Sequence, residues 1–210
     1  MISPLYAIAD ADAAAQAGWT LTDLARAYFD GGARLLQIRA KNLSGAAFLE
    51  VVSAIVALGR AAGATLIVND RADIARLAAA DGVHLGQNDL APKTARSFLG
   101  PAALIGLSTH TEEQLDRAAN EPTNYLAIGP IFATATKATG YQPVGVEMIG
   151  RAARAGRPVV AIGGVTLDNA RSAIAAGAAS VAVIGDLLSM GDPARRVRQF
   201  LAVLAPDTAR

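Results

Sequence analysis

Two threonines and a lysine follow a short apolar run in the second half of the chain. Residues 125–128 (YLAI) are typical of a buried strand, and Thr134, Thr136 and Lys137 come soon after it. Their hydroxyl groups can hydrogen-bond to anions, and the lysine ammonium is a compact positive charge. Placed at the end of a rigid element, this group of side chains suits a phosphorylated ligand.

A second cationic group lies on the strand-like segment 35–41 (LLQIRAK). Alternation puts Gln37, Arg39 and Lys41 on one face and apolar side chains on the other. The apolar face should meet helices, so the polar face should point into the interior of the sheet or its mouth. An arginine there needs a partner. A structural ion pair with an acid on a neighbouring strand is one option, and a ligand anion, which the charge of Lys41 favours, is the other.

Two aspartates could complete this cluster. Asp70 follows one strand-like run and Asp89 follows the next. Beside a basic cluster, two carboxylates indicate a site for a hard cation that bridges to phosphate oxygens, which is the usual pattern for magnesium. Simpler interpretations stay open, since Asp70 could cap a helix starting near Arg71 and Asp89 could be a turn residue.

Three other polar residues follow or lie in strand-like runs. Ser108 ends the fifth run, where a serine is often only a turn or cap residue. His84 and His110 are interpreted as structural histidines. None of the three is assigned chemistry on its position alone.

Glycines after the last two strand-like runs indicate a neutral anion site. Residues 161–164 (AIGG) and 183–186 (VIGD) would bring backbone N–H groups close to a phosphate. The candidate groups are residues 163–164 together with Ile184 and Gly185. Asp186 would repel a phosphate there unless its carboxylate points away.

The chain lacks several common catalytic groups. It has no cysteine, which excludes disulfides, thiolate catalysis and zinc–sulfur sites, and its two histidines are too few for a histidine-rich metal site. There is no serine–histidine–acid pattern and no obvious general-base pair. A pyrophosphate with magnesium would suit the charged group formed by Arg39, Lys41 and Lys137 with the two aspartates. The chemistry should therefore rest on electrostatic stabilisation of a departing pyrophosphate, with these three side chains as the catalytic cations.

Composition limits the partners. The net charge of +1 over 210 residues gives no general field for nucleic acid or an anionic membrane. No uncharged apolar run reaches the roughly 18 residues of a membrane span. Asp10 and Asp12 after the first apolar run argue against a signal peptide. We expect a cytoplasmic protein that acts on small molecules, with no nucleic-acid or membrane partner, and a homodimer remains an open option.

Eight strand-like runs alternate with helical patterns along the chain. They lie near residues 5–9, 34–39, 65–68, 82–85, 103–107, 124–128, 158–162 and 180–184. Such alternation predicts an α/β fold with a parallel sheet, and eight units predict a single (β/α)8 TIM barrel domain over residues 1–210. An open doubly wound sheet is the competing fold, weakened because no Gly-x-Gly-x-x-Gly follows the first strand. Residues 129–143, without clear periodicity, could form a lid.

Local signals place several helix termini. Residues 44–60 carry apolar side chains at one-face helical spacing. Thr111 with Gln114 forms a capping-box signature, and Thr166 is expected to cap the next-to-last helix. Pro193 is expected in the first turn of the last helix.

Taken together, six segments resemble the thiamine-phosphate synthase (thiamine-phosphate pyrophosphorylase) family. They occur in the family's order and span nearly the whole chain: residues 37–41 (QIRAK), 69–70 (ND), 82–89 (GVHLGQND), 106–108 (GLS), 129–137 (GPIFATATK) and 161–164 (AIGG). The first and fifth segments are specific, whereas the paired glycines are not. The resemblance implies a (β/α)8 barrel and a transferase. Its reaction joins hydroxymethylpyrimidine pyrophosphate to thiazole phosphate, or a carboxylated form of it. Thiamine monophosphate and pyrophosphate are the products, magnesium is required, and the mechanism is dissociative.

Roles follow for the residues that match the family's motifs. The resemblance implies that the pyrimidine pyrophosphate is held by Gln37, Arg39, Lys41, Asn69, Ser108 and Lys137. It implies magnesium at Asp70 and Asp89, and the thiazole phosphate at Thr134, Thr136, Gly164 and the Ile184–Gly185 backbone. Tyr6 would border the pyrimidine. Gly185 stands where many members have serine, so a backbone contact is kept and a hydroxyl contact is not.

Two other functions compete. A thiazole tautomerase paralogue shares the barrel but does not need to bind pyrophosphate. The combination of Lys41, Asp70, Asp89, Thr136 and Lys137 favours the synthase. A non-catalytic phosphate-sensing barrel would be expected to lack some of these groups. A magnesium requirement would separate either from the synthase.

Overall fold

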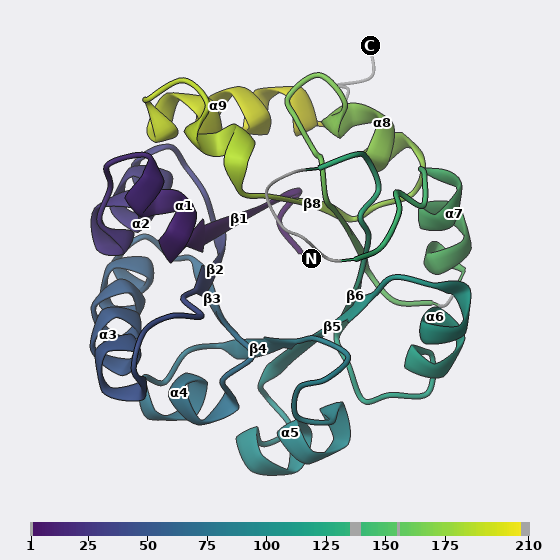
Figure 1. Ribbon diagram of the computed structural model, residues 1–210, viewed down its shortest axis with the longest axis horizontal. Coiled ribbons are helices and arrows are strands. Elements are labelled where there is room, and N and C mark those ends of the chain that lie inside the picture. Colours follow the sequence, from purple (N-terminus) through teal and green to yellow (C-terminus); the bar gives the residue numbers. More distant parts are fainter. Residues whose placement is uncertain (1, 135–139, 155, 207–210) are drawn as a thin grey trace.

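Parallel strands close into a barrel whose order around the axis follows the order in the chain. The computed structural model describes residues 2–134, 140–154 and 156–206. The strands are β1 (Leu5–Asp10), β2 (Leu35–Arg39), β3 (Thr65–Asn69), β4 (Gly82–Leu85), β5 (Leu104–Thr109), β6 (Tyr125–Ile128), β7 (Val159–Ile162) and β8 (Ser180–Val183). Figure 1 shows this ring surrounded by helices.

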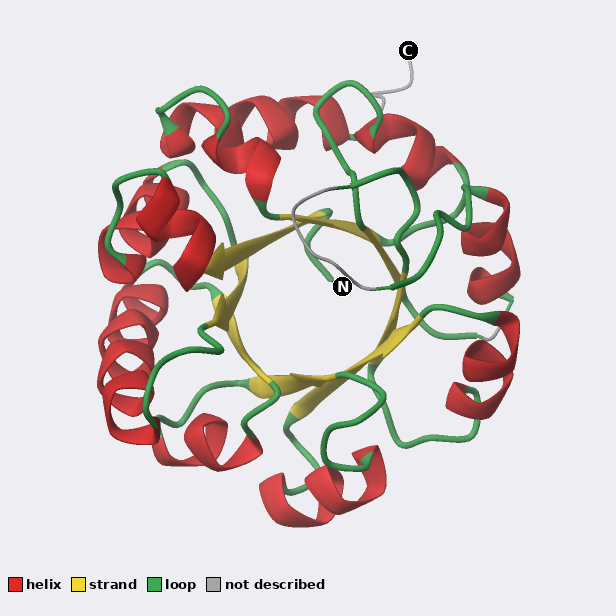
Figure 2. Cartoon of the chain, in the orientation of Figure 1, coloured by secondary structure: helices red, strands yellow, loops and turns green. Residues whose placement is uncertain are grey.

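Helices cover the outside of the ring, as Figure 2 shows most simply. They are α1 (Ala11–Gln16), α2 (Leu21–Asp30), α3 (Gly45–Ala61), α4 (Ala72–Leu77), α5 (Pro92–Leu99), α6 (Glu112–Ala118), α7 (Glu147–Ala153), α8 (Ala170–Ala175) and α9 (Pro193–Leu204), with a 3₁₀ turn η1 (Gly185–Leu188) before α9. Two helices separate β1 from β2, and elsewhere an α-helix lies between successive strands.

The barrel closes where the first strand meets the last. Leu5 pairs with Val181 in parallel register, and the Val181 amide donates to the Pro4 carbonyl at 2.9 Å. The predicted α/β fold with a (β/α)8 barrel is therefore confirmed, and the open doubly wound sheet is wrong. Each predicted strand overlaps an observed one.

Apolar side chains form two layers. One cluster lies between the strands and the helices and includes Leu36 and Ile38 of β2. A smaller cluster fills the barrel interior and includes Leu35 of the same strand together with Tyr6 and Tyr125. Gln37 is buried and hydrogen-bonds to Tyr6, so it faces inward. The predicted alternation of inner and outer faces along this strand is thus confirmed.

Helix termini follow the sequence signals in most cases. Ser44 caps α3 by accepting from the Ala47 amide, and Pro193 is the first residue of α9. Thr111 caps α6, but the Gln114 side chain accepts from the amide of His110 rather than from that of the cap itself. The capping box is therefore incomplete.

The prediction that Thr166 caps the next-to-last helix is wrong. A turn over residues 167–169 delays the start of α8, whose N-cap is Asn169. The Asn169 side chain accepts from the Thr166 amide at 2.8 Å. A side-chain acceptor three residues downstream thus holds the turn together, and the helix begins only after it.

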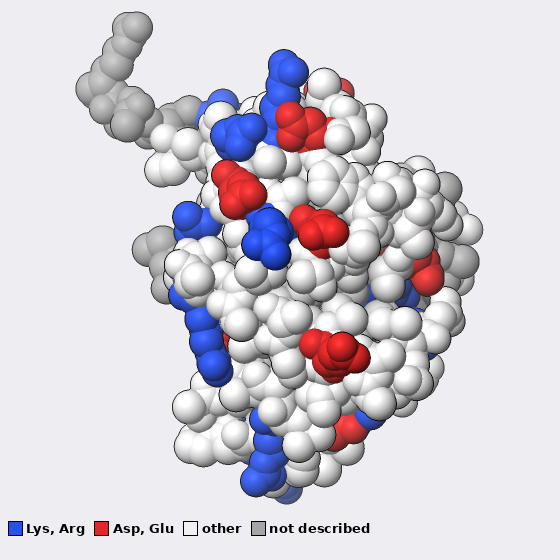
Figure 3. All heavy atoms as spheres, turned by 90° about the vertical axis from the view of Figure 1, so that its left-hand side faces the viewer, with Lys and Arg blue, Asp and Glu red and all other residues white. Residues whose placement is uncertain are grey.

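Charges of both signs are interspersed on the face that carries α1, α2 and α3 (Figure 3). Such mixing agrees with the small net charge and gives this face no single-sign field. Among the helices that the structure describes, none is long and apolar enough to cross a membrane.

Candidate active site

The polar residues after β2, β3 and β4 gather at the carboxyl end of the barrel. All strands are parallel, so their carboxyl ends share one rim, and loops at this rim carry the active sites of such barrels. Arg39 ends β2, Asn69 is the buried last residue of β3, and Asp89 lies in the loop after β4. The structure therefore brings four of the charged candidates, Arg39, Lys41, Asp70 and Asp89, to one edge.

Arg39 already has a protein partner. Its guanidinium forms an ion pair with Asp10 at the end of neighbouring β1, and both side chains are largely buried. The ion pair with an acid on an adjacent strand, one of the two alternatives for this arginine, is therefore present. The pairing also positions the guanidinium, because the other Asp10 oxygen is held by the Ala13 amide at 3.0 Å.

Asp70 and Asp89 lie together with Lys41. The Lys41 ammonium is 3.4 Å from an Asp70 oxygen, and the two carboxyl groups interact directly. Burial and then the neighbouring Asp89 carboxyl raise the pKa of Asp70, while Lys41 acts in the opposite direction. Two like charges are thus held together at the rim.

Of the two simpler interpretations, the helix cap at Asp70 is wrong and the turn residue at Asp89 is confirmed. Asp70 does not cap the following helix, whose N-cap is Arg71, and it takes a left-handed backbone conformation with φ of 62°. One Asp89 oxygen accepts from the Gly86 amide at 2.7 Å. Asp89 is therefore a turn residue as well as a neighbour of Asp70.

Two carboxylates alone are few protein ligands for a metal ion. Within the described residues, no three histidine, cysteine, aspartate or glutamate side chains converge as a metal cluster. Magnesium commonly keeps several waters and uses one or two protein carboxylates plus substrate phosphates. The donor set and the like charges of Asp70 and Asp89 therefore fit a magnesium ion that arrives with a phosphorylated ligand.

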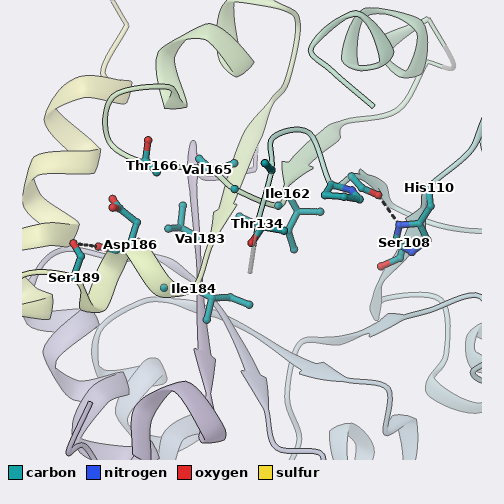
Figure 4. Close-up of a pocket in the computed structure, with 17 residues that line it drawn as sticks. Ser108, His110, Thr134, Ile162, Val165, Thr166, Val183, Ile184, Asp186 and Ser189 are labelled. Carbon is teal, nitrogen blue, oxygen red and sulfur yellow. Dashed lines mark hydrogen bonds between the residues drawn. The ribbon is translucent and has the colours of Figure 1, made fainter. Parts of the chain in front are cut away.

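A cavity of about 370 Å³ opens beside this cluster, at the ends of β5 to β8 (Figure 4). Ile162, Val183 and Ile184 form apolar parts of its wall, while Thr134 and Ser108 present hydroxyl groups. All four members of the predicted neutral anion site also line it, namely Gly163, Gly164, Ile184 and Gly185. Ser108 lines this cavity from β5, the neighbour of β4 in the ring, and Asp89 lies in the loop after β4.

The two glycines after β7 are required by close backbone approach. Gly163 and Gly164 have φ of 93° and 66°, and a Cβ on Gly164 would lie 2.4 Å from the Ala133 carbonyl oxygen. The loop after β6 therefore packs directly on them. These glycines therefore have a packing reason that does not depend on any use of their N–H groups by a phosphate.

Asp186 lines the cavity, but its carboxylate is engaged elsewhere. One oxygen accepts from Arg196 of α9 at 2.7 Å and from the Leu167 amide at 3.1 Å. The arginine offsets its charge. The repulsion expected of Asp186 toward a phosphate is thereby reduced.

Two predicted residues, Thr136 and Lys137, lie outside the described residues, as does the middle of the predicted lid. Beyond that gap, the Tyr141 ring stacks on His110 with ring centres 4.3 Å apart, and its hydroxyl accepts from Gln114 at 3.1 Å. His110 also contacts the Gly129 carbonyl through Nδ1 at 2.5 Å and lines the cavity. His110 is thus held between the loops after β5 and β6.

Sequence reasoning misses three residues at or beneath this site. Asp10 directly follows the apolar part of β1, so the rule that finds polar residues after other strands could have found it. Tyr141 gives no sequence signal of its contact with His110. Tyr125 reads in the sequence only as part of a buried strand, yet its hydroxyl bonds to Tyr6 and His84 inside the barrel.

Comparisons with known proteins agree with this geometry. A thiamine-phosphate synthase of Koribacter versatilis (strain Ellin345) is 47% identical over 206 residues, covering 95% of each chain. One from Chlorobium luteolum is 43% identical and covers 83% of this chain and 82% of its own. The solved thiamine phosphate pyrophosphorylase from Pyrococcus furiosus superposes with a TM-score of 0.86 at 29% identity, covering 95% of this chain and 94% of that one.

The family model described as thiamine monophosphate synthase matches residues 5–187, which include all eight barrel strands and both halves of the site. The family resemblance seen in the sequence is therefore confirmed, and this chain belongs to the thiamine monophosphate synthase family.

Proposed function

We propose that this protein is a magnesium-dependent thiamine-phosphate synthase. It would join hydroxymethylpyrimidine pyrophosphate to thiazole phosphate and release pyrophosphate. With the carboxylated thiazole phosphate, carbon dioxide would be released as well. The observation that carries the proposal is the pairing of two different anion sites. The Asp70 and Asp89 carboxyls lie with Lys41 after β2 to β4, and a cavity lined by Ser108 and Gly164 lies at the ends of β5 to β8.

The pyrimidine pyrophosphate would occupy the charged side. Gln37, Asn69 and Ser108 would hold it, and Arg39, Lys41 and Lys137 would face its phosphates. Lys41 is about half exposed and can turn toward an anion, whereas Arg39 is anchored by Asp10. The role of Lys137, which lies outside the described residues, rests on the sequence motif.

Asp70 and Asp89 would hold magnesium. Their mutual interaction supports this, because the raised pKa of Asp70, which arises from burial and then from Asp89, records a repulsion that a divalent cation would remove. When bound, the ion would supply neutralisation of the charge that develops on the leaving pyrophosphate.

The thiazole phosphate would occupy the neutral side, at Gly164, Ile184 and Gly185 with the hydroxyls of Thr134 and Thr136. The carbon–oxygen bond to pyrophosphate breaks first, and pyrophosphate leaves with the bonding electrons. The thiazole nitrogen then donates its lone pair to the resulting pyrimidine methylene cation and forms the new carbon–nitrogen bond. No proton moves in either step, so the lack of a general-base pair does not hinder the reaction.

The test is a direct assay. Purified protein is mixed with both substrates, with and without magnesium, and thiamine phosphate is followed by fluorescence after oxidation. Product that requires magnesium supports the synthase. No product from intact substrates would reject it and return weight to the tautomerase or the phosphate sensor.

A cytoplasmic location and a homodimer stay predictions from the sequence. Fractionation of cells and light scattering of the purified protein would test them.

A further inference from the structure

A continuous chain of buried hydrogen bonds crosses the barrel interior beneath the candidate site. Gln37 Nε2 is 3.0 Å from the Tyr6 hydroxyl, which is 2.9 Å from the Tyr125 hydroxyl. That oxygen is 3.1 Å from Nδ1 of His84, whose Nε2 is 2.8 Å from the Ser108 hydroxyl. The members come from β2, β1, β6, β4 and β5, so this chain of hydrogen bonds joins five strands.

One arrangement of hydrogens makes these bonds run in a single direction. The Gln37 amide donates to Tyr6, whose own hydrogen then goes to Tyr125, although the contact between the two hydroxyls also allows the reverse. In this arrangement Tyr125 donates to Nδ1 of His84, the imidazole hydrogen is on Nε2, and that Nε2–H donates to Ser108. The hydrogen of the Ser108 hydroxyl is then available to an acceptor in the site.

Tyr125 is the rigid link in this chain. Its ring stacks on His84, with centres 5.6 Å apart, and meets Tyr6 edge-on at 5.9 Å. A Cβ on Gly106 would lie 2.1 Å from Cζ of Tyr125, so the absence of a side chain at Gly106 makes room for the ring. Burial raises the pKa of Tyr125 well above its ordinary value, so the hydroxyl always has a hydrogen to donate.

We propose that the hydrogen bonds run in this direction and that Tyr125 is a positioning residue, which fixes the tautomer of His84 and thereby presents the Ser108 hydroxyl as a hydrogen-bond donor to the pyrimidine substrate. The identity of that substrate rests on the proposed function. The direction of the chain does not. Gln37, at the other end of the chain, is also assigned to this substrate, so the chain holds both polar contacts in one arrangement.

The first test is independent of activity. Nitrogen NMR of protein labelled with ¹⁵N-histidine reports which ring nitrogen carries hydrogen, and only His84 and His110 contribute. His110→Asn assigns the signals. We expect the Nε2–H tautomer at His84 in the parent protein, and loss of that single tautomer in Tyr125→Phe. An Nδ1–H tautomer in the parent, or an unchanged His84 signal in Tyr125→Phe, would overturn the proposal.

The second test is kinetic. Tyr125→Phe keeps the ring that Gly106 accommodates, so the barrel should fold, which circular dichroism can verify. We expect the KM for the pyrimidine pyrophosphate to rise about tenfold, the size of effect typical of one buried hydrogen bond, with little change in the KM for thiazole phosphate. Equal KM values for the pyrimidine substrate in parent and variant would overturn the positioning role.

Two further variants serve as controls for Tyr125→Phe. Tyr28→Phe removes another buried tyrosine hydroxyl, one without a hydrogen-bond partner among the described residues, and should leave both readouts unchanged. Tyr6→Phe removes the contact to Tyr125 but keeps the Tyr125 hydroxyl beside Nδ1 of His84, so the Nε2–H tautomer should persist in that variant. A parent protein without synthase activity would reject the proposed function, while the tautomer result would still decide the direction of the chain.

Discussion

At the residue scale, the most consequential feature is the repulsion between the neighbouring carboxylates of Asp70 and Asp89. A closed barrel would be more stable without this repulsion, and Lys41 at 3.4 Å offsets only part of it. Repulsion held at a functional rim is expected where a ligand cation restores balance. The two residues are therefore open to separate tests, one of stability and one of metal dependence.

Asp70→Asn should stabilise the metal-free protein at neutral pH. Burial and Asp89 raise the pKa of Asp70 in the folded state. The folded protein thus keeps a proton that the unfolded chain has already released, so the stability present below the ordinary aspartate pKa of about 4 is lost as the pH rises through the raised value. Asparagine tolerates the left-handed backbone at this position.

The measurement is the melting temperature of metal-free protein between about pH 4 and pH 8. We expect Asp70→Asn to exceed the parent at pH 7 and to converge with it toward pH 4. The exposed Asp168→Asn should follow the parent throughout. A difference between the parent and Asp70→Asn that does not change with pH would contradict burial and carboxyl repulsion as its cause.

Asp89→Asn should weaken the use of magnesium. Asparagine can still accept from the Gly86 amide, so the turn should keep its shape. We expect the magnesium concentration for half-maximal rate to rise at least about tenfold, because one anionic ligand is lost. A magnesium titration of the rate measures this, with Asp116→Asn on remote α6 as a control. An unchanged titration would leave Asp89 as a turn residue only.

At the element scale, the loops after β7 and β8 are held by a helix outside the barrel. Asp186 in η1 bonds to Arg196 of α9 and to the Leu167 amide, and both members of the ion pair are only 14% exposed. The last helix therefore supports two walls of the cavity. That arrangement explains how an aspartate can line a candidate phosphate site.

Asp186→Ala should lower the stability of the protein. It removes a charge-assisted bond to Arg196 and the acceptor for Leu167, which together should cost about 2 kcal/mol. Urea unfolding followed by circular dichroism would measure the change. Asp168→Ala, in the same region but exposed, should change it little. A stability of Asp186→Ala equal to that of the parent would show that α9 does not hold these loops.

At the scale of the whole molecule, the site exists only when the ring is closed. Its members come from strands around the full barrel, and β1 must pair with β8 to complete the ring. An unfolded chain cannot present them together. Ligands of the site should therefore bind the folded state alone and stabilise it by mass action.

Magnesium pyrophosphate should raise the melting temperature. At a hundredfold excess over Kd the linkage corresponds to an increase of roughly 5–10 °C for a chain of this size. Magnesium alone and pyrophosphate alone should each give a smaller shift in melting temperature. The carboxylates need the metal ion and the cationic side chains need the pyrophosphate. Equal shifts with magnesium alone and with the mixture would argue against a joint site.

The sequence by itself determined the faces and the ends of the elements. Period-two alternation from Leu35 to Arg39 assigned inner and outer sides correctly, and the β2, β3 and β4 runs ended where the charged residues begin. These signals are local, so they can be recognised in the sequence without knowledge of the fold. They were sufficient for the barrel and for the neighbourhood of Asp70, Asp89 and Ser108. The roles of the site residues and the single domain over residues 1–210 stay predictions.

Only the tertiary structure decided which groups are partners. Arg39 meets Asp10 from 29 positions away, and Tyr6 meets Tyr125 across 119. Partners of this kind depend on strand register and on ring closure, and neither leaves a mark in the spacing of residues along one strand. Asp186 illustrates the same limit. It reads as an obstacle to phosphate in the sequence, and it becomes a support for the cavity once α9 brings Arg196 beside it.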